Sequence, residues 1–426
     1  MTKVPLLCGL LLQCAPSPTS AQQIGSGPAN QIQNGLRQKQ ALKINEAIYQ
    51  ANGFGNTFMI TTPDGNVIVD TSSPALAKHH VDLLKAVNGG PVKYIILTHA
   101  HGDHTGGAAL WKEPGTQILS QKNAVAFRAY QRRLGGFFAT RNAAQFGLAA
   151  TPPNTGAGIR APIPDPTILF DEEYRFTLGG VEFNVFHTPG ETPDHLTVWV
   201  PKYKAAFIGD NYYESFPNMY TLRGTEPRWP LEYISSLNKV MQLKPEILLP
   251  SHGRVIEGNA EIGRRLTQYR DAIQYVHDEV VKGMNAGKDV FTLMRDVRLP
   301  AALEVGEGYG KLTWSVRGIY EGYAGWFDMN PATMYDVPAS SVHSDITRLA
   351  GGPERLAKLA VEQVQQGRNV EALHVTAMAL AADPHNRPAL EARLLALAAL
   401  RELSHNTNEQ GWLDYSIRQT QRQLNP

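Results

Sequence analysis

The six residues His99-Ala100-His101-Gly102-Asp103-His104 constrain this chain more than any other stretch of its sequence. They bring together three imidazoles and one carboxylate, directly after the apolar run 91–97. A buried strand that runs straight into a polar loop lets a rigid sheet aim the loop's side chains at one point. Zinc prefers nitrogen and oxygen ligands of this kind, and so dense a cluster is rare in an incidental polar turn. The sequence therefore predicts a metal site at the end of this strand.

Cysteine usage and net charge narrow the possibilities further. Both cysteines, Cys8 and Cys14, lie near the N-terminus, so the rest of the chain offers neither a thiolate ligand nor a disulfide framework. The metal must then be held by imidazole and carboxylate groups. The chain has 40 Lys+Arg against 39 Asp+Glu, a net charge of +1, which is too small to attract a phosphate backbone or an anionic membrane. We therefore expect a small-molecule substrate and no nucleic acid.

The N-terminus has the pattern of a secretory signal. One positive charge at Lys3 precedes the apolar stretch 4–14, and small residues lead to a predicted cleavage after Ala21. The stretch is too short to span a membrane, and no later stretch reaches that length. We expect a signal peptide over 1–21 and a periplasmic or secreted protein. A lipid anchor at Cys14 is the weaker alternative, because Gln13 is not the small residue usual before such a cysteine.

The middle of the chain reads as an α/β domain. Segments 57–62 and 67–71 flank a Pro-Asp-Gly-Asn turn as two strands, and a helix-like segment 75–87 precedes the strand 91–97. Alternating strands and helices predict a layered α/β architecture. Segment 121–166 interleaves arginines with aromatics before a Pro/Gly-rich end, which fits either a surface helix with its loop or a lid over the site.

The end of the chain predicts a separate helical domain, as expected for a 426-residue chain that exceeds one ordinary core. Ala and Leu recur at helical spacing over 353–403, with breaks at 366–369 and 383–386. The breaks are similar to those of tetratricopeptide units, but one or two such units do not make a stable solenoid. We expect these helices to pack against another surface.

Further ligand-type residues follow later apolar runs: His195 lies after 181–186, Asp210 after 205–208, and His252 after 247–249. With the histidine cluster, this series resembles the metallo-β-lactamase superfamily over about residues 50–260. The resemblance implies an αββα sandwich, taken here as a catalytic domain over 22–299, with two Zn2+ ions per chain. It assigns one zinc to His99, His101 and His195, the other to Asp103, His104 and His252, and a bridging position to Asp210.

The same resemblance implies roles around the metals. Asp70 matches an aspartate that braces the metal loop, and His187 matches a position that does not bind metal. Asp103 and Asp210 are expected to be catalytic. Two divalent ions lower the pKa of a shared water, so that a metal-bound hydroxide is available at neutral pH. Hydrolysis is the expected reaction.

Segments 218–224 and 320–332 resemble the alkylsulfatases, zinc enzymes that hydrolyse alkyl sulfate esters. The helices after residue 350, which end in Gly-Trp-Leu-Asp-Tyr, are similar to the dimerisation domain of those enzymes, so we expect a helical domain over 300–426 and a homodimer. Asn218, Tyr220 and Arg223 are then candidate substrate-binding residues. A guanidinium offers a planar pair of donors to a sulfate group. The alternative for Arg223 is an ion pair with Glu226.

Departures from the alkylsulfatase pattern leave the substrate open. His195 and Asp210 stand where many alkylsulfatases carry carboxylates, and Glu214 and Pro217 occupy a region where a histidine is expected. The sequence printed also stops at Pro426, without a sterol-carrier-like third domain, which favours a less greasy substrate. The leading hypothesis is a two-zinc hydrolase of an anionic sulfate ester. A β-lactamase-, lactonase- or thioesterase-like acyl hydrolase is the alternative, and a binding module with a vestigial site is disfavoured by the intact ligand set.

Overall fold

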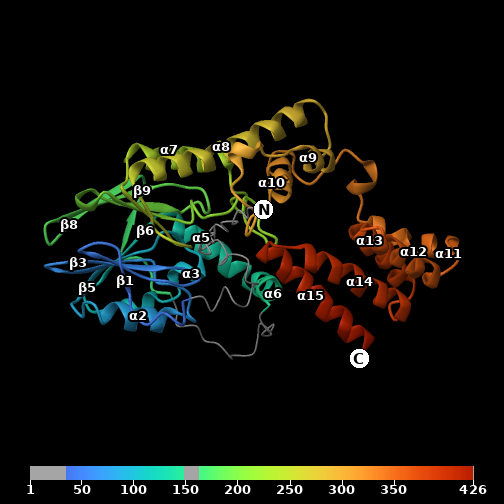
Figure 1. Cartoon of the computed structure of the whole chain (residues 1–426), viewed down its shortest axis with the longest axis horizontal. Coiled ribbons are helices and arrows are strands. Elements are labelled where there is room, and N and C mark those ends of the chain that lie inside the picture. The colour runs from blue at the N-terminus through green and yellow to red at the C-terminus, as the bar shows by residue number, and fades with distance from the viewer. Residues whose placement is uncertain (1–34, 148–162, 426) are drawn as a thin grey trace, which may run out of the picture.

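The computed structural model describes residues 35–147 and 163–425. The predicted signal sequence and the possible lipid anchor at Cys14 lie outside the described residues, as does the Pro/Gly-rich part of segment 121–166. Within the described ranges, two sheets pack face to face, helices cover their outer faces, and a run of helices extends to one side (Figure 1).

The first sheet contains its strands in sequence order. These are β1 (Leu42–Lys43), β2 (Ile48–Ala51), β3 (Thr57–Thr62), β4 (Gly65–Val69), β5 (Val92–Ile96), β6 (Gln117–Gln121) and β7 (Ile168–Phe170). Strands β4 to β7 run parallel, and β1 to β4 pair antiparallel. All of β4 is buried because both of its faces are covered. The predicted strands at 57–62, 67–71 and 91–97 correspond to β3, β4 and β5.

The second sheet has the order β13-β12-β11-β10-β9-β8. Its strands are β8 (Glu173–Leu178), β9 (Val181–His187), β10 (Leu196–Val200), β11 (Ala205–Gly209), β12 (Ile247–Pro250) and β13 (Ile256–Glu257). Neighbouring strands pair antiparallel except β11 and β12, which are parallel.

Alternating side chains build the layers. On β11, Phe207 joins the core between the sheets, whereas Ile208 joins the core under helices α7 (Pro230–Gln242) and α8 (Asn259–Asn285). On the first sheet, Ile68 faces away from the partner sheet into a core with Leu84 of α2 (Ala77–Lys85) and Trp111 of α4 (Ala108–Trp111). Each fully buried apolar side chain of this size contributes about 1.5–3 kcal/mol. The predicted αββα sandwich is confirmed.

The chain ends in a helical region. Its helices are α9 (Val290–Asp296), α10 (Leu312–Ala324), α11 (His343–Leu349), α12 (Pro353–Gln365), α13 (Asn369–Ala382), α14 (Arg387–Leu403) and α15 (Thr407–Leu424). Helices α12, α13 and α14 pack closely because alanines such as Ala360, Ala372 and Ala392 line their contact. The predicted breaks at 366–369 and 383–386 lie at the helix ends, where Asn386 caps α14 by accepting a hydrogen bond from the Ala389 N–H.

The helical region packs against the catalytic region through α10, which contacts α8. Val316 and Ile319 of α10 share a core with Ile273 of α8, so apolar packing continues past the boundary predicted between 299 and 300. The boundary itself stays a prediction.

Of the helices in the described ranges, none combines the length and the apolar character needed to cross a membrane.

Candidate metal centre

Asp70 organises the loop that carries the histidine cluster. Its Oδ1 accepts a hydrogen bond from the Thr98 N–H at 2.8 Å, and its Oδ2 accepts from the hydroxyls of Thr98 and Ser251 at 2.8 and 2.7 Å. The same Oδ2 lies 2.9 Å from Nδ1 of His104. This contact fixes the imidazole so that Nε2 faces the centre, the usual role of a carboxylate behind a metal-binding histidine. Asp70 therefore ties the loop after β5 to the loop after β12.

The loops after β5, β11 and β12 bring two groups of ligand atoms together. The first group consists of His99, His101 and Asp210, and the second of Asp103, His104 and His252; within each, the ligand atoms lie within 4.8 Å of one another. Oδ2 of Asp210 is 3.7 Å from Nε2 of His99 and 3.1 Å from Nε2 of His252. One carboxylate oxygen is therefore within reach of both groups, which form a single binuclear arrangement.

The donor atoms fit a pair of divalent cations. Nε2 of His104 and Oδ1 of Asp210 are buried and, within the described residues, have no hydrogen-bond partner. Leaving such groups unpaired costs about 1–3 kcal/mol each, which a bound cation would remove. Nε2 of His99 and Nδ1 of His101 also lie only 2.8 Å apart, both aimed at the same space. Imidazole and carboxylate ligands of this kind suit zinc.

Burial lowers the pKa of His104 and His252, but Asp210 and Asp103 outweigh it and raise both, whereas His99, His101 and Asp210 take the forms that bind metal. Burial, helped by the charge of His104, holds the pKa of His99 well below its ordinary value, and burial does the same for His101 beside Arg223. Both imidazoles are therefore neutral near pH 7. Burial opposes ionisation of Asp210, yet His104 and His252 outweigh it and hold the pKa of Asp210 well below its ordinary range. Asp210 is an anion at neutral pH.

His195 lies beside the first group but belongs to neither. Its ring centroid is 5.2 Å from that of His99, and its Nε2 accepts a hydrogen bond from the backbone N–H of Asp210 at 3.0 Å. Gly209 allows this approach, because a Cβ there would collide with the His195 ring. In this structure Nε2 of His195 is therefore occupied by the backbone. The metal role of His195 stays a prediction.

Glu191, which the sequence analysis did not select, lies next to the first group. Its Oε1 is 3.9 Å from Nδ1 of His101, and its Oε2 pairs with Nη1 of Arg228 at 2.5 Å. Burial raises the pKa of Glu191 to about 7, although Arg228 acts in the opposite direction. The signal available in the sequence was a carboxylate directly after Thr-Pro-Gly, in the loop that follows β9.

The predicted substrate residues differ in their contacts and exposure, and of the three only Arg223 has a described contact to a metal-ligand residue. Nη2 of Arg223 is 3.4 Å from Nε2 of His101. In the described ranges no ion pair joins Arg223 to Glu226, contrary to the alternative considered for it. Asn218 is buried with its side-chain oxygen unpaired among the described residues. Tyr220 is 39% exposed and packs on Gly318 of α10.

Helices α5 (Asn123–Arg133) and α6 (Gly135–Phe146) form one wall of the centre. The ring of Phe127 meets the ring of His101 edge-on at 5.8 Å. Phe146 contacts Phe54, which in turn contacts the His252 ring at 5.3 Å. The described part of segment 121–166 therefore flanks the metal ligands, and whether it acts as a lid stays a prediction.

Tyr309, from the segment between α9 and α10, is a second residue that the sequence analysis missed. Burial raises the pKa of its phenol, which also experiences the charges of Arg223 and Asp103. The phenol therefore stays protonated at neutral pH, and it lies close enough to Arg223 for each group to affect the pKa of the other. The sequence around Tyr309 contains no motif that indicates a functional role. Its position depends on how the segment between α9 and α10 packs against the sandwich.

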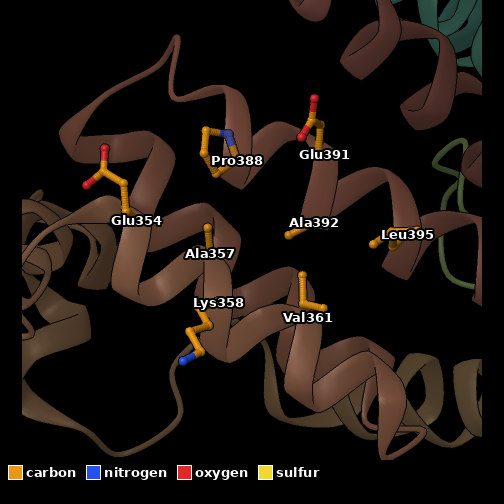
Figure 2. A pocket seen from close by; sticks show the side chains of 8 residues that line it. All are labelled: Glu354, Ala357, Lys358, Val361, Pro388, Glu391, Ala392 and Leu395. Atoms are coloured by element: carbon orange, nitrogen blue, oxygen red, sulfur yellow. The ribbon is translucent and has the colours of Figure 1, made fainter.

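Two hollows are open to ligands. One, of about 310 Å³, adjoins the centre and is lined by Phe127, Glu191, Arg228 and Trp229 among others. The other, of about 280 Å³, lies between α12 and α14 and is lined by Ala357, Lys358, Glu391 and Leu395 among others (Figure 2). No residue of either metal-ligand group lines either hollow. The first hollow lies beside the centre because it is lined by Phe127 and Glu191, which contact or face His101.

Comparisons with known proteins agree with this geometry. Residues 51–252 match the family model of the metallo-beta-lactamase superfamily, and residues 293–423 match that of alkyl sulfatase dimerisation. A linear primary-alkylsulfatase from Pseudomonas sp. is 28% identical over 83% of this chain and 72% of its own length. An alkyl/aryl-sulfatase from Saccharomyces cerevisiae is 27% identical over 90% of this chain and 65% of its own length.

A solved structure shares the fold across both regions. It is a stereoselective inverting sec-alkylsulfatase from Pseudomonas sp., with a TM-score of 0.81, 20% identity, and coverage of 89% of this chain and 65% of that chain. This chain therefore spans about two thirds to three quarters of the length of these relatives.

Proposed function

This chain belongs to the metallo-beta-lactamase superfamily and carries an alkyl sulfatase dimerisation region, and on that basis we propose that it is a two-zinc hydrolase of sulfate esters. His99, His101 and Asp210 would hold one ion, and Asp103, His104 and His252 the other. When bound, two such ions lower the pKa of a shared water and neutralise charge on the substrate's oxygens. Asp103 and Asp210 are the catalytic carboxylates in this proposal.

The observation that carries the sulfate assignment is the contact between Arg223 and His101. With Nδ1 of His101 bound to a metal ion, the neutral ring would carry its hydrogen on Nε2. Nη2 of Arg223, 3.4 Å away, is also a donor. Two donors this close need an acceptor between or beside them, and a sulfate oxygen supplies one. Asn218 and Tyr220 remain candidate substrate residues, as the sequence predicts.

Turnover on a small panel of substrates tests the proposal directly. The purified, zinc-loaded protein should hydrolyse alkyl or aryl sulfate esters faster than lactams, lactones or thioesters of similar size. The reverse preference would support the acyl-hydrolase alternative, which shares the same metal ligands. No turnover on any ester by metal-loaded protein would favour a binding module.

Metal content should distinguish Glu191 from His195 as the remaining ligand of the first ion. We expect Glu191→Gln to lose about one ion per chain, because its carboxylate faces Nδ1 of His101. His195→Gln should keep both, because its Nε2 is occupied by the Asp210 N–H. Elemental analysis of the two purified variants measures this. Loss of an ion from His195→Gln alone would restore the ligand set predicted from the sequence.

Unfolding must be followed alongside, because Glu191→Gln leaves Arg228 buried without an anion. Removing one partner of a buried ion pair costs about 3–5 kcal/mol. The comparison should therefore use protein that is folded by circular dichroism, with ions counted per folded chain.

We further propose a homodimer that uses the segment 323–342, here called the arm. Every residue of the arm is exposed. Its large apolar side chains include Trp326 at 74% and Met329 at 85% exposure. So much exposed apolar surface marks an interface, and the matched dimerisation region includes the arm.

Negative charges introduced into the arm should prevent the protomers from associating. The full-length protein should be dimeric by light scattering at micromolar concentration, and Trp326→Asp with Met329→Asp should be mainly monomeric. Val370→Asp, at an exposed apolar position on α13, is the matched control and should stay dimeric. A double variant that remains dimeric would place the interface elsewhere.

Export belongs to the proposal as well. The pattern over 1–21 favours cleavage after Ala21 and a periplasmic or secreted protein.

A further inference from the structure

The last helix of the chain returns to the wall of the metal centre. Helix α15 lies against α6 (Figure 1). Nε2 of Gln145 on α6 donates to Oδ1 of Asn408 at 2.9 Å, and Nε1 of Trp412 donates to Oε1 of Gln145 at 3.3 Å. The two helices approach so closely that a Cβ at Gly411 would collide with the Gln145 carbonyl. The contact is thus specific in shape and in polar pairing.

One turn earlier on α6, Arg141 connects this contact to the substrate side. Its Nε and Nη2 donate to the carbonyl oxygens of Arg223 and Leu222 at 2.7 and 2.5 Å. The Arg141 guanidinium lies 5.1 Å from the Phe137 ring centroid and 5.3 Å from the Trp412 ring centroid. Aromatic rings attract a guanidinium at such distances. Trp412 of α15 therefore helps to hold the group that fixes the Arg223 backbone.

Arg223 needs such support because it carries a partly buried charge that has no ion-pair partner among the described residues. Its side chain meets Nε2 of His101, and the charge of Arg228 also acts on it. Within the described residues no carboxylate lies within ion-pair distance of Arg223. The hydrogen bonds from Arg141 to the carbonyl oxygens of Leu222 and Arg223 restrain the backbone from which this guanidinium projects.

The N-terminus of α15 holds a second part of the same wall. The side-chain amides of Asn406 and Asn408 both donate to the Tyr309 carbonyl at 2.9 Å. The Tyr309 N–H donates to the Ser215 hydroxyl at 3.0 Å. The start of α15 therefore holds the Tyr309 backbone directly, whereas Trp412 of α15 reaches the Arg223 backbone through Arg141 of α6.

We propose that Arg141 and Trp412 are positioning residues for anion recognition, so that α15 is part of the substrate-binding wall as well as of the dimerisation region. The inference rests on the proposed role of Arg223. It predicts that loss of the Trp412 ring, which lies about 270 residues after Arg141 in the sequence, changes substrate affinity while the metal ligands stay intact.

Two measurements on the metal-loaded, full-length protein test it. Hydrogen exchange of the amides in 218–226 reports whether the Arg223 segment is held. Calorimetric titration with inorganic sulfate reports anion affinity. Arg141→Gln and Trp412→Leu should accelerate the exchange and weaken sulfate binding about tenfold, as expected when a positioning contact is lost. Arg141→Lys should recover part of the affinity, since it keeps the charge between the rings.

Matched variants make the result specific. Arg133→Gln, an exposed arginine on α5, should leave both measurements unchanged. The double variant Arg141→Gln/Arg223→Gln should bind sulfate no more weakly than Arg223→Gln alone, because Arg141 acts through Arg223. Trp412→Phe, which keeps a ring beside Arg141 but loses the bond to Gln145, should change both measurements less than Trp412→Leu does.

The outcomes separate this inference from the function on which it rests. Unchanged exchange in both Arg141→Gln and Trp412→Leu would overturn the positioning role, whatever the activity. Additive loss in the double variant would overturn it too, because Arg141 would then act independently. Faster exchange together with normal sulfate binding by Arg223→Gln would uphold the positioning role and remove Arg223 from anion recognition.

Discussion

Asp210→Ala should leave the protein with neither metal ion firmly bound and reduce hydrolysis at least about 10³-fold, a loss expected for a group shared by the whole reactive centre. Oδ2 of Asp210 lies within 3.7 Å of Nε2 on His99, His104 and His252, so both groups of ligands depend on it. Removing it also removes the charge that stabilises those imidazoles around a cation. Elemental analysis and turnover measure the two effects.

Single-group variants sharpen this prediction. His101→Ala should lose one ion and His252→Ala the other, whereas Asp210→Ala should lose both. Asp171→Ala, an exposed aspartate paired with Lys122, is the matched control and should retain both ions. Circular dichroism should show that the fold persists in each. Two ions and near-normal turnover in Asp210→Ala would mean that the binuclear arrangement has been assigned to the wrong residues.

Arg223→Ala should reduce the hydrolysis of sulfate esters well over tenfold, with little effect on neutral lactones or lactams. A partly desolvated, charge-assisted contact to an anion is worth about 2–5 kcal/mol when one partner is removed. Neutral substrates gain nothing from the guanidinium beyond its effect on folding. Arg223→Lys should recover only part of the loss, because lysine keeps the charge but not the paired donors.

The comparison requires variants whose zinc content and thermal unfolding match those of the parent protein. Arg254→Ala is a suitable control, since Arg254 is exposed and pairs with Glu214 instead of facing the metal ligands. Equal losses on anionic and neutral substrates, with metal and fold intact, would make Arg223 a structural residue and favour the acyl-hydrolase alternative.

The amino-acid sequence by itself indicated a layered α/β domain and the location of the metal centre, and its resemblance to the metallo-β-lactamase superfamily implied the αββα sandwich. Hydrophobic alternation and turn residues are local properties, so the strands at 57–62 and 91–97 followed from them. The spacing His-x-His-x-Asp-His places its side chains within one loop, and the neighbourhood of His99, His101, Asp103 and His104 therefore required little knowledge of the rest of the chain.

Only the tertiary structure decided which distant groups complete that centre. Whether His195 faces a metal or the backbone depends on how closely β11 approaches its ring, which Gly209 sets and the local sequence does not reveal. Glu191 enters the site because buried Arg228 holds it there. Trp412 and Arg141 meet through the docking of α15 on α6, since contacts between segments so far apart arise from packing and not from spacing. The sequence therefore specified the reactive loop, and the fold specified its environment.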